Sequence, residues 1–234
     1  MRQFHLSNKK FRVLKAVDHI VDEAAQWVIL FHGFGADAYD LSQLNDVLRT
    51  PKPTNWLFPQ GPLEVPIGPG WTGRAWWPIN VEDLQRRAQQ GSIVDLSEEK
   101  PAGLFDVRPA IFEMINQLGV SWDKVILGGF SQGAMCATDI FLNAPQTPRG
   151  LILFSGALIN KAEWAPLAKN RIGAKYFISH GKSDPVLPFR CGQQLESVLN
   201  NGGMKGKMLS FEGGHEIPPA ALTAAIHYLK EVAL

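Results

Sequence analysis

Three side chains in the sequence could together carry out acyl transfer: a serine, an aspartate and a histidine, in that order along the chain. They are Ser131 in GGFSQGAM, Asp184 in HGKSDPVLP and His215 in GGHEIP. A serine hydroxyl is a weak nucleophile at neutral pH, so it needs a base beside it, and the base needs a group that orients it. We therefore predict Ser131 as the nucleophile, His215 as the general base and Asp184 as the orienting acid.

Ser131 lies between Gly129 and Gly133, at the point where an apolar run changes to a helical pattern. Residues 125–127 predict a buried strand, and a helix is expected to begin near Ala134. Gly-x-Ser-x-Gly between a strand and a helix is typical of a nucleophile elbow, in which the serine backbone is strained and the glycines avoid collisions. The alternative is a glycine-rich turn without chemistry.

Asp184 and His215 each come shortly after a predicted strand. Residues 175–181 precede the aspartate, and residues 207–213 precede the histidine. Because the carboxyl ends of parallel strands meet at one edge of a sheet, we expect both side chains to lie near Ser131. Taken singly, Asp184 could be a turn residue before a proline and His215 a surface histidine. Their order and their positions at strand ends favour catalysis.

An oxyanion hole needs two backbone N–H donors, and the sequence offers a candidate for each. One is Gln132, the residue after the nucleophile, and the other is Phe34 in HGFGAD, directly after the predicted strand of residues 27–31. The glycines of this loop let the backbone approach the substrate. We interpret His32 as a packing residue and His180 as a structural residue that holds the Asp184 loop.

Strand and helix patterns alternate through the chain, which predicts an α/β fold with a mainly parallel central sheet and helices on both faces. One domain over residues 1–234 is expected. Residues 11–17 predict an antiparallel edge strand, Pro109 suggests a helix start near itself, and Gly119 is a plausible helix stop. Further strands are expected at 55–59 and 150–156, and helices at 36–49, 104–119, 133–143, 190–200 and 219–234.

Residues 60–103 interrupt the alternation with a stretch rich in glycine, proline and tryptophan, followed by a polar segment. An irregular excursion this long is usually functional or disordered, and its tryptophans argue against disorder. Bulky indoles near the serine would favour short or flat acyl groups. The alternative is that the indoles only bury the excursion against the body. The predicted substrate-binding residues are Trp71, Trp76, Trp77 and Ile217, with Phe34 beside them.

Charge and composition exclude several other classes of protein. The net charge of the 234 residues is +1, which argues against a large nucleic-acid surface. No run reaches the ~18 apolar residues of a membrane span, and the N-terminus has no signal-peptide pattern. Two cysteines make no disulfide framework, so the cytoplasm is the default location, with a trimmed chain as the alternative. The predicted chemistry needs no metal or cofactor, and a homodimer is left open.

The motifs HGFGAD, GGFSQGAM, LILFSGAL, HGKSDPVLP and GGHEIP together resemble the phospholipase/carboxylesterase family of α/β-hydrolases, which includes acyl-protein thioesterases and small bacterial carboxylesterases. The resemblance implies a serine hydrolase without a separate cap, and it places RAWWPI near the substrate. It implies the Ser131–Asp184–His215 triad, with Phe34 and Gln132 at the oxyanion hole. The first 26 residues and the length of the tryptophan-rich excursion depart from the family pattern.

Three functions are compatible with these residues. The leading hypothesis is a carboxylesterase-type serine hydrolase that cleaves esters of small to medium acyl chains through an acyl-enzyme. The second is a long-chain acyl thioesterase or lysophospholipase, because the same triad serves both. The third is a non-catalytic ligand-binding protein on the same fold, since fold alone does not determine function.

Overall fold

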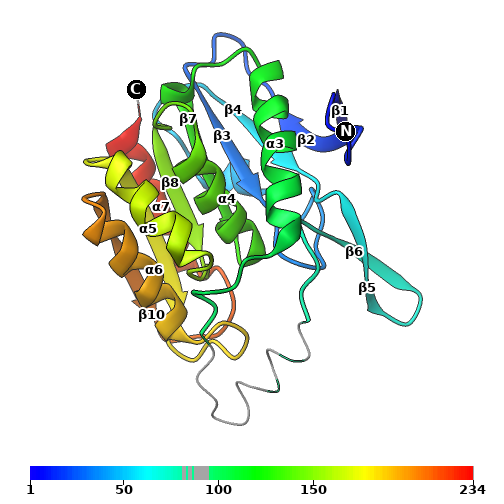
Figure 1. The fold of residues 1–234 in the computed structure, drawn as a ribbon. Helices are drawn as coiled ribbons and strands as arrows, with labels where there is room; N and C mark the ends of the chain where they lie inside the picture. The colour runs from blue at the N-terminus through cyan, green and yellow to red at the C-terminus, as the bar shows by residue number, and fades with distance from the viewer. Residues whose placement is uncertain (81–82, 84–85, 87–94, 234) are drawn as a thin grey trace.

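The centre of the molecule is an eight-stranded sheet (Figure 1). The computed structural model describes residues 1–80, 83, 86 and 95–233. In spatial order the strands are β1 (Arg2–His5), β2 (Val13–His19), β4 (Thr54–Pro59), β3 (Gln26–Phe31), β7 (Val125–Phe130), β8 (Gly150–Phe154), β9 (Lys175–Gly181) and β10 (Lys205–Phe211).

The sheet is parallel from β4 through β10, and only β1 and β2 run antiparallel to their neighbours. Strands β3, β4 and β8 are buried along their whole length, because helices cover both faces. This arrangement confirms the predicted α/β-hydrolase architecture. The position expected for residues 11–17 was wrong, because β1 pairs outside β2 and takes the edge. Strand β1 has four residues and one buried side chain, so it is too short to be predicted from the periodicity of its apolar residues.

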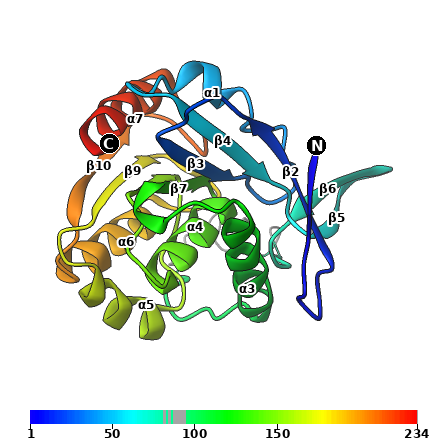
Figure 2. The same cartoon turned by 90° about the horizontal axis from the view of Figure 1, so that it is seen from above.

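Helices pack against both faces of the sheet and form two layers, which Figure 2 shows from above. One apolar core lies between the sheet and α3, α4, α5 and α6, and the other lies beneath α1 and α7. Helices α3, α6 and α7 bury the apolar side of an amphipathic sequence, whereas α4 is buried along nearly its whole length. The bounds are α1 (Leu44–Val47), α3 (Ala102–Gln117), α4 (Gln132–Asn143), α5 (Lys161–Ala168), α6 (Phe189–Asn201) and α7 (Pro219–Val232).

Two expected helices differ from the observed ones. Residues 36–49 contain only the short α1, because Asp37 accepts a hydrogen bond from the Tyr39 N–H and begins a series of turns instead. Helix α3 begins at Ala102, and Pro109 lies inside it. Proline has no N–H, so Pro109 donates no hydrogen bond to the carbonyl of Phe105 one turn earlier. Phe105 is 45% exposed, so water can bind this carbonyl instead.

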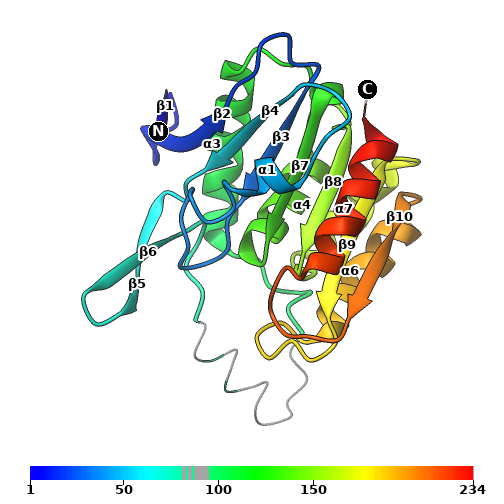
Figure 3. The ribbon, with the colours of Figure 1, turned by 180° about the vertical axis from the view of Figure 1, so that it is seen from behind.

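Part of the stretch expected to be irregular, residues 60–103, forms a β-hairpin of β5 (Leu63–Gly68) and β6 (Trp71–Ala75). The hairpin projects from the body beside the carboxyl ends of the parallel strands (Figure 3). Its base is tied to the loop after β3, because the Gly35 N–H donates to the Arg74 carbonyl and the Arg74 N–H donates to the Ala36 carbonyl. The polar segment that follows lies largely outside the described residues.

Candidate active site

Ser131 occupies the sharp turn between β7 and α4. Its backbone has φ 54° and ψ −119°, an unusual conformation for a residue with a side chain. The flanking glycines make the turn sterically feasible: a Cβ at Gly133 would lie 1.9 Å from the Phe31 carbonyl oxygen, and one at Gly129 would lie 2.5 Å from the same oxygen. The predicted elbow geometry is therefore present, with the serine at the start of a helix.

Asp184 and His215 lie side by side because their strands are in register. Strands β9 and β10 pair so that Gly181 faces Phe211, and the loops that follow them leave the same edge of the sheet. His215 Nδ1 lies 2.6 Å from Asp184 Oδ2. The carboxylate is buried, and its other oxygen accepts the N–H groups of Val186 and Leu187 at 2.9 and 2.8 Å.

The contact with Asp184 determines which nitrogen of His215 is available for chemistry. A carboxylate oxygen accepts a hydrogen bond here, so in the neutral imidazole Nδ1 of His215 carries the proton and Nε2 carries the lone pair. The ring also packs against Phe130, the residue before Ser131, with ring centroids 4.8 Å apart. The imidazole is thus held on the serine side of the Asp184 loop.

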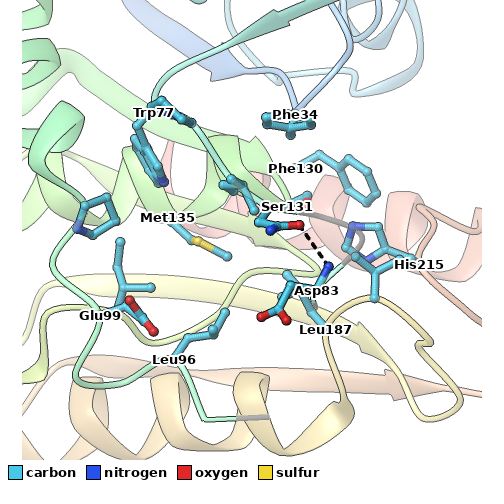
Figure 4. Close-up of a pocket in the computed structure, with 17 residues that line it drawn as sticks. Phe34, Trp77, Asp83, Leu96, Glu99, Phe130, Ser131, Met135, Leu187 and His215 are labelled. Atoms are coloured by element: carbon cyan, nitrogen blue, oxygen red, sulfur yellow. Dashed lines mark hydrogen bonds between the residues drawn. The ribbon is translucent and has the colours of Figure 1, made fainter. Parts of the chain in front are cut away.

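A cavity of about 460 Å³ contains both Ser131 and His215 in its wall. Figure 4 shows Phe34, Phe130 and His215 near the serine, with Leu96 and Glu99 farther along the cavity. Apolar side chains dominate the lining, as is usual for a pocket that binds a small organic molecule. The described lining residues are Gly33, Phe34, Trp77, Pro78, Ile79, Asn80, Asp83, Leu96, Glu99, Pro101, Phe130, Ser131, Met135, Ile159, Val186, Leu187 and His215.

The two predicted oxyanion donors both remain available. The Ser131 carbonyl accepts the N–H groups of Ala134 and Met135 and so points into α4. In a trans peptide the C=O and N–H point in opposite directions, so the Gln132 N–H points out of the helix start. In the described part of the chain, no oxygen accepts the N–H of Gln132 or of Phe34.

The side chain of Gln132 has a role that the sequence did not reveal. It is fully buried, accepts the Trp76 N–H at 3.0 Å and donates to the Trp77 carbonyl at 2.7 Å. A glutamine followed directly by the small and apolar residues 133–137 is the signal that could have pointed to such a bond. The contact ties the backbone of Trp77, a cavity-lining residue, to the helix that follows Ser131.

The structure separates the predicted substrate-binding residues into two groups. Phe34 and Trp77 line the cavity. Trp71 is 73% exposed on the hairpin, Trp76 is fully buried, and Ile217 packs on the core beneath α7, so none of these three is among the described lining residues.

His180 lies in the core beside the acid. Its Nε2–H donates to the Leu187 carbonyl at 2.7 Å, and Nε2 is 3.5 Å from Asp184 Oδ2. Burial lowers the pKa of His180, which keeps the ring neutral near pH 7. These contacts agree with the structural role expected for His180, because they brace the turn whose N–H groups hold Asp184.

A comparison with models of protein families finds one that matches most of the chain. Residues 14–233 match the family described as Phospholipase/Carboxylesterase. The chain belongs to this family. Its relatives include acyl-protein thioesterase 1 of Schizosaccharomyces pombe, which is 25% identical in an alignment of 213 positions that covers 88% of this chain and 90% of the relative. The Kluyveromyces lactis protein of the same name is 30% identical over 74% of this chain and 75% of its own length.

Solved structures of similar fold carry related names. Esterase PE8 aligns with a TM-score of 0.73 and 24% identity, covering 93% of this chain and 97% of that one. A carboxylesterase from Mesorhizobium loti aligns with a TM-score of 0.72 and 17% identity, covering 97% and 98%. This member of the phospholipase/carboxylesterase family is therefore a hydrolase of the esterase and thioesterase type. Among the described residues, no helix has the length and apolar character needed to cross a bilayer.

Proposed function

We propose that the protein is a serine hydrolase that cleaves carboxylic esters of small to medium acyl chains, with Ser131, His215 and Asp184 as its triad. One observation carries the proposal. The Nδ1 of His215 lies 2.6 Å from Asp184 Oδ2, while His215 and the strained Ser131 line the same cavity. This arrangement supplies a nucleophile, a base and an orienting acid beside a space for substrate.

In the first half-reaction, His215 Nε2 takes the Ser131 proton as Oγ attacks the ester carbonyl. Asp184 keeps the ring in the required tautomer and stabilises the imidazolium that forms. The carbonyl oxygen becomes an oxyanion, which the N–H groups of Phe34 and Gln132 are free to stabilise. The imidazolium then gives its proton to the departing alcohol, and the acyl group stays on Ser131 Oγ.

In the second half-reaction, a water molecule replaces the alcohol. His215 takes a proton from this water, which attacks the acyl carbon and forms a second oxyanion at the same two donors. Collapse of this intermediate returns the proton to Ser131 Oγ and releases the carboxylic acid. All proton transfers use the same nitrogen, which is why the fixed tautomer of His215 matters.

The shape of the cavity supports acyl chains of limited length. Its volume of about 460 Å³ lies in the lower half of the usual range of roughly 300–1,000 Å³ for small-molecule sites. Trp77 is almost fully buried, and its backbone carbonyl accepts a hydrogen bond from Gln132, so this residue forms a well-anchored part of the cavity wall. Met135, Ile159 and Leu187 offer apolar surface for the chain.

The decisive experiment measures hydrolysis of p-nitrophenyl esters from acetate to palmitate by wild type and Ser131→Ala. We expect activity to disappear in the variant and the wild-type optimum to lie at short or medium chains. Ser155→Ala is a matched control, because Ser155 also has a positive φ after a central strand and is buried, yet does not line the cavity. Equal rates for wild type and Ser131→Ala would overturn the nucleophile assignment.

A second candidate function is a long-chain acyl thioesterase or lysophospholipase. The observation that favours it is that relatives at 25–30% identity, matched over most of both chains, bear the name acyl-protein thioesterase 1. Acyl-coenzyme A thioesters of four to sixteen carbons, with the released thiol measured, separate the two candidates. Faster turnover of palmitoyl than of butyryl thioester would select the thioesterase, and lysophosphatidylcholine would test the lipase.

A further inference from the structure

The peptide between Gly33 and Phe34 carries one of the two free N–H donors and is held from its other side. Its carbonyl oxygen accepts a hydrogen bond from His32 Nδ1 at 2.7 Å and a longer one from the Ala36 N–H at 3.3 Å. The described chain has no cis peptide, so the Phe34 N–H points opposite to this carbonyl. Whatever holds the Gly33 carbonyl therefore sets the direction of the donor.

The proton on His32 Nδ1 is fixed by a second contact. His32 Nε2 accepts the Gly61 N–H at 2.9 Å, which requires a lone pair on that nitrogen and leaves the single proton on Nδ1. The ring is buried, and burial lowers the pKa of His32, so the neutral form persists around pH 7. The His32 side chain, protonated on Nδ1, thus links Gly61 to the loop after β3.

Trp76 holds His32 in place from behind. Its indole N–H donates to the His32 carbonyl at 2.9 Å, and the two rings pack with centroids 5.1 Å apart. The Trp76 backbone N–H is in turn bound by the Gln132 side chain, on the residue whose own N–H is the other donor. The two donors therefore belong to a single hydrogen-bonded unit.

We propose that His32 is a positioning residue of the oxyanion hole: its Nδ1–H orients the Gly33–Phe34 peptide so that the Phe34 N–H faces the developing oxyanion. Trp76 acts behind it by fixing the His32 backbone. The proposal rests on the serine-hydrolase function above and replaces the packing role that the sequence suggested for His32. A packing residue would tolerate any substitute of similar size, whereas this role requires a donor at the Nδ1 position.

Two substitutions at His32 separate the roles. His32→Asn keeps a donor near the Nδ1 position and loses the contact with Gly61. His32→Gln reaches toward Gly61 and lacks the donor to the Gly33 carbonyl. With p-nitrophenyl butyrate, we expect His32→Asn to retain kcat within about fivefold, and His32→Gln to lose about 10- to 100-fold in kcat with little change in KM, since removal of a whole donor costs roughly 10²–10³.

A trifluoromethyl ketone with a butyl chain gives an independent readout, because it forms a tetrahedral adduct on serine and places an oxyanion at the donors. Its affinity should fall in His32→Gln by the same factor as kcat and remain near wild type in His32→Asn. If both variants keep wild-type kcat and adduct affinity, or if the loss lies in KM alone, the proposal is wrong.

Two tryptophan substitutions, one at Trp76 and one at Trp164, test the proposal independently if a His32 variant does not fold. Trp76→Phe removes the N–H that binds the His32 carbonyl. Trp164→Phe removes a comparable buried indole N–H, which binds Asp139 away from the cavity. We expect kcat and adduct affinity to fall only in Trp76→Phe, and equal values for the two would overturn the inference. Full activity in Ser131→Ala would instead overturn the underlying function, so the two failures are distinguishable.

Discussion

Arg108 binds the buried carboxylate of Asp139 with two parallel hydrogen bonds, Nε to Oδ2 at 2.6 Å and Nη2 to Oδ1 at 2.7 Å. Asp139 lies on α4, the helix that follows Ser131, and Arg108 lies on α3. The indole N–H of Trp164 on α5 donates to the same carboxylate at 2.9 Å. This cluster joins three helices, and none of its side chains is among the described residues that line the cavity.

We expect Arg108→Met to reduce the free energy of unfolding by about 3–5 kcal/mol, because it leaves the Asp139 carboxylate buried without its cation. Urea denaturation measures the change. Lys175→Met is the control, since it breaks an ion pair with Glu231 in which both side chains are largely solvent-exposed, and it should have little effect. An equal loss in the two variants would contradict the argument from burial.

Stability should fall as the pH decreases from 7 toward 5. Burial lowers the pKa of His32 and of His180 in the folded protein below the ordinary value of about 6.5. Below pH 6.5 the unfolded chain binds these protons and the folded chain does not, so acid favours unfolding by up to about 1.4 kcal/mol per pH unit for each group. Denaturation at pH 7.5 and 5.5 should show a smaller decrease in His32→Asn, and identical decreases would argue against a buried neutral His32.

Gln132→Met should destabilise the protein and weaken substrate binding while the Gln132 backbone N–H stays in place. Methionine cannot pair with the Trp76 N–H or the Trp77 carbonyl, and two unpaired buried groups cost about 2–4 kcal/mol. We expect KM for p-nitrophenyl butyrate to rise several-fold as Trp77 loosens. Thr138→Val, on the same helix, removes only a bond to the Ala134 carbonyl and should leave KM unchanged.

Glu99 should make the enzyme discriminate against acyl groups that end in a carboxylate. Its side chain lines the cavity away from Ser131, and no described cation pairs with it (Figure 4). Two like charges about 6 Å apart repel by about 0.7 kcal/mol in bulk water and by about 3 kcal/mol at the effective dielectric constant of a protein surface, and the exposed Glu99 lies toward the lower value. Relative to p-nitrophenyl butyrate, Glu99→Gln should hydrolyse the glutarate monoester about three- to tenfold better than wild type does.

The control for the Glu99 prediction is its neighbour in the sequence. Glu98 is exposed and is not among the described lining residues, so Glu98→Gln should leave the ratio of the two rates unchanged. A ratio that responds equally to both substitutions would mean that net charge, rather than the cavity wall, sets the preference.

The mainly parallel sheet and the candidate catalytic residues were within reach of the sequence, because both depend on local patterns. Apolar runs covered on both faces indicate parallel strands, and parallel strands bring the loops after residues 181 and 211 together regardless of their separation along the chain. The 2.6 Å contact between Asp184 and His215 follows from this topology.

The positions of Trp71 and Trp76 could not be predicted by the same reasoning, although Trp77 lines the cavity as expected. Trp71 and Trp76 are five residues apart, yet one is 73% exposed and the other is fully buried. The difference arises because residues 63–75 form a hairpin that projects from the body, and composition alone does not show which end of it meets the core. Ile217 was placed near the substrate for its position in the His215 loop, but its side chain turns toward the core beneath α7.

Strand β10 is the last of the described sheet, and it pairs only with β9. It is also the strand that leads to His215, while the Ser131 turn follows the interior strand β7. Edge strands fray before the centre of a sheet does, and their amides exchange with solvent first. His215, the proposed general base, is therefore attached to one of the first elements to open on warming, so activity should be lost reversibly at temperatures where the amide protons of residues 125–130 are still fully protected.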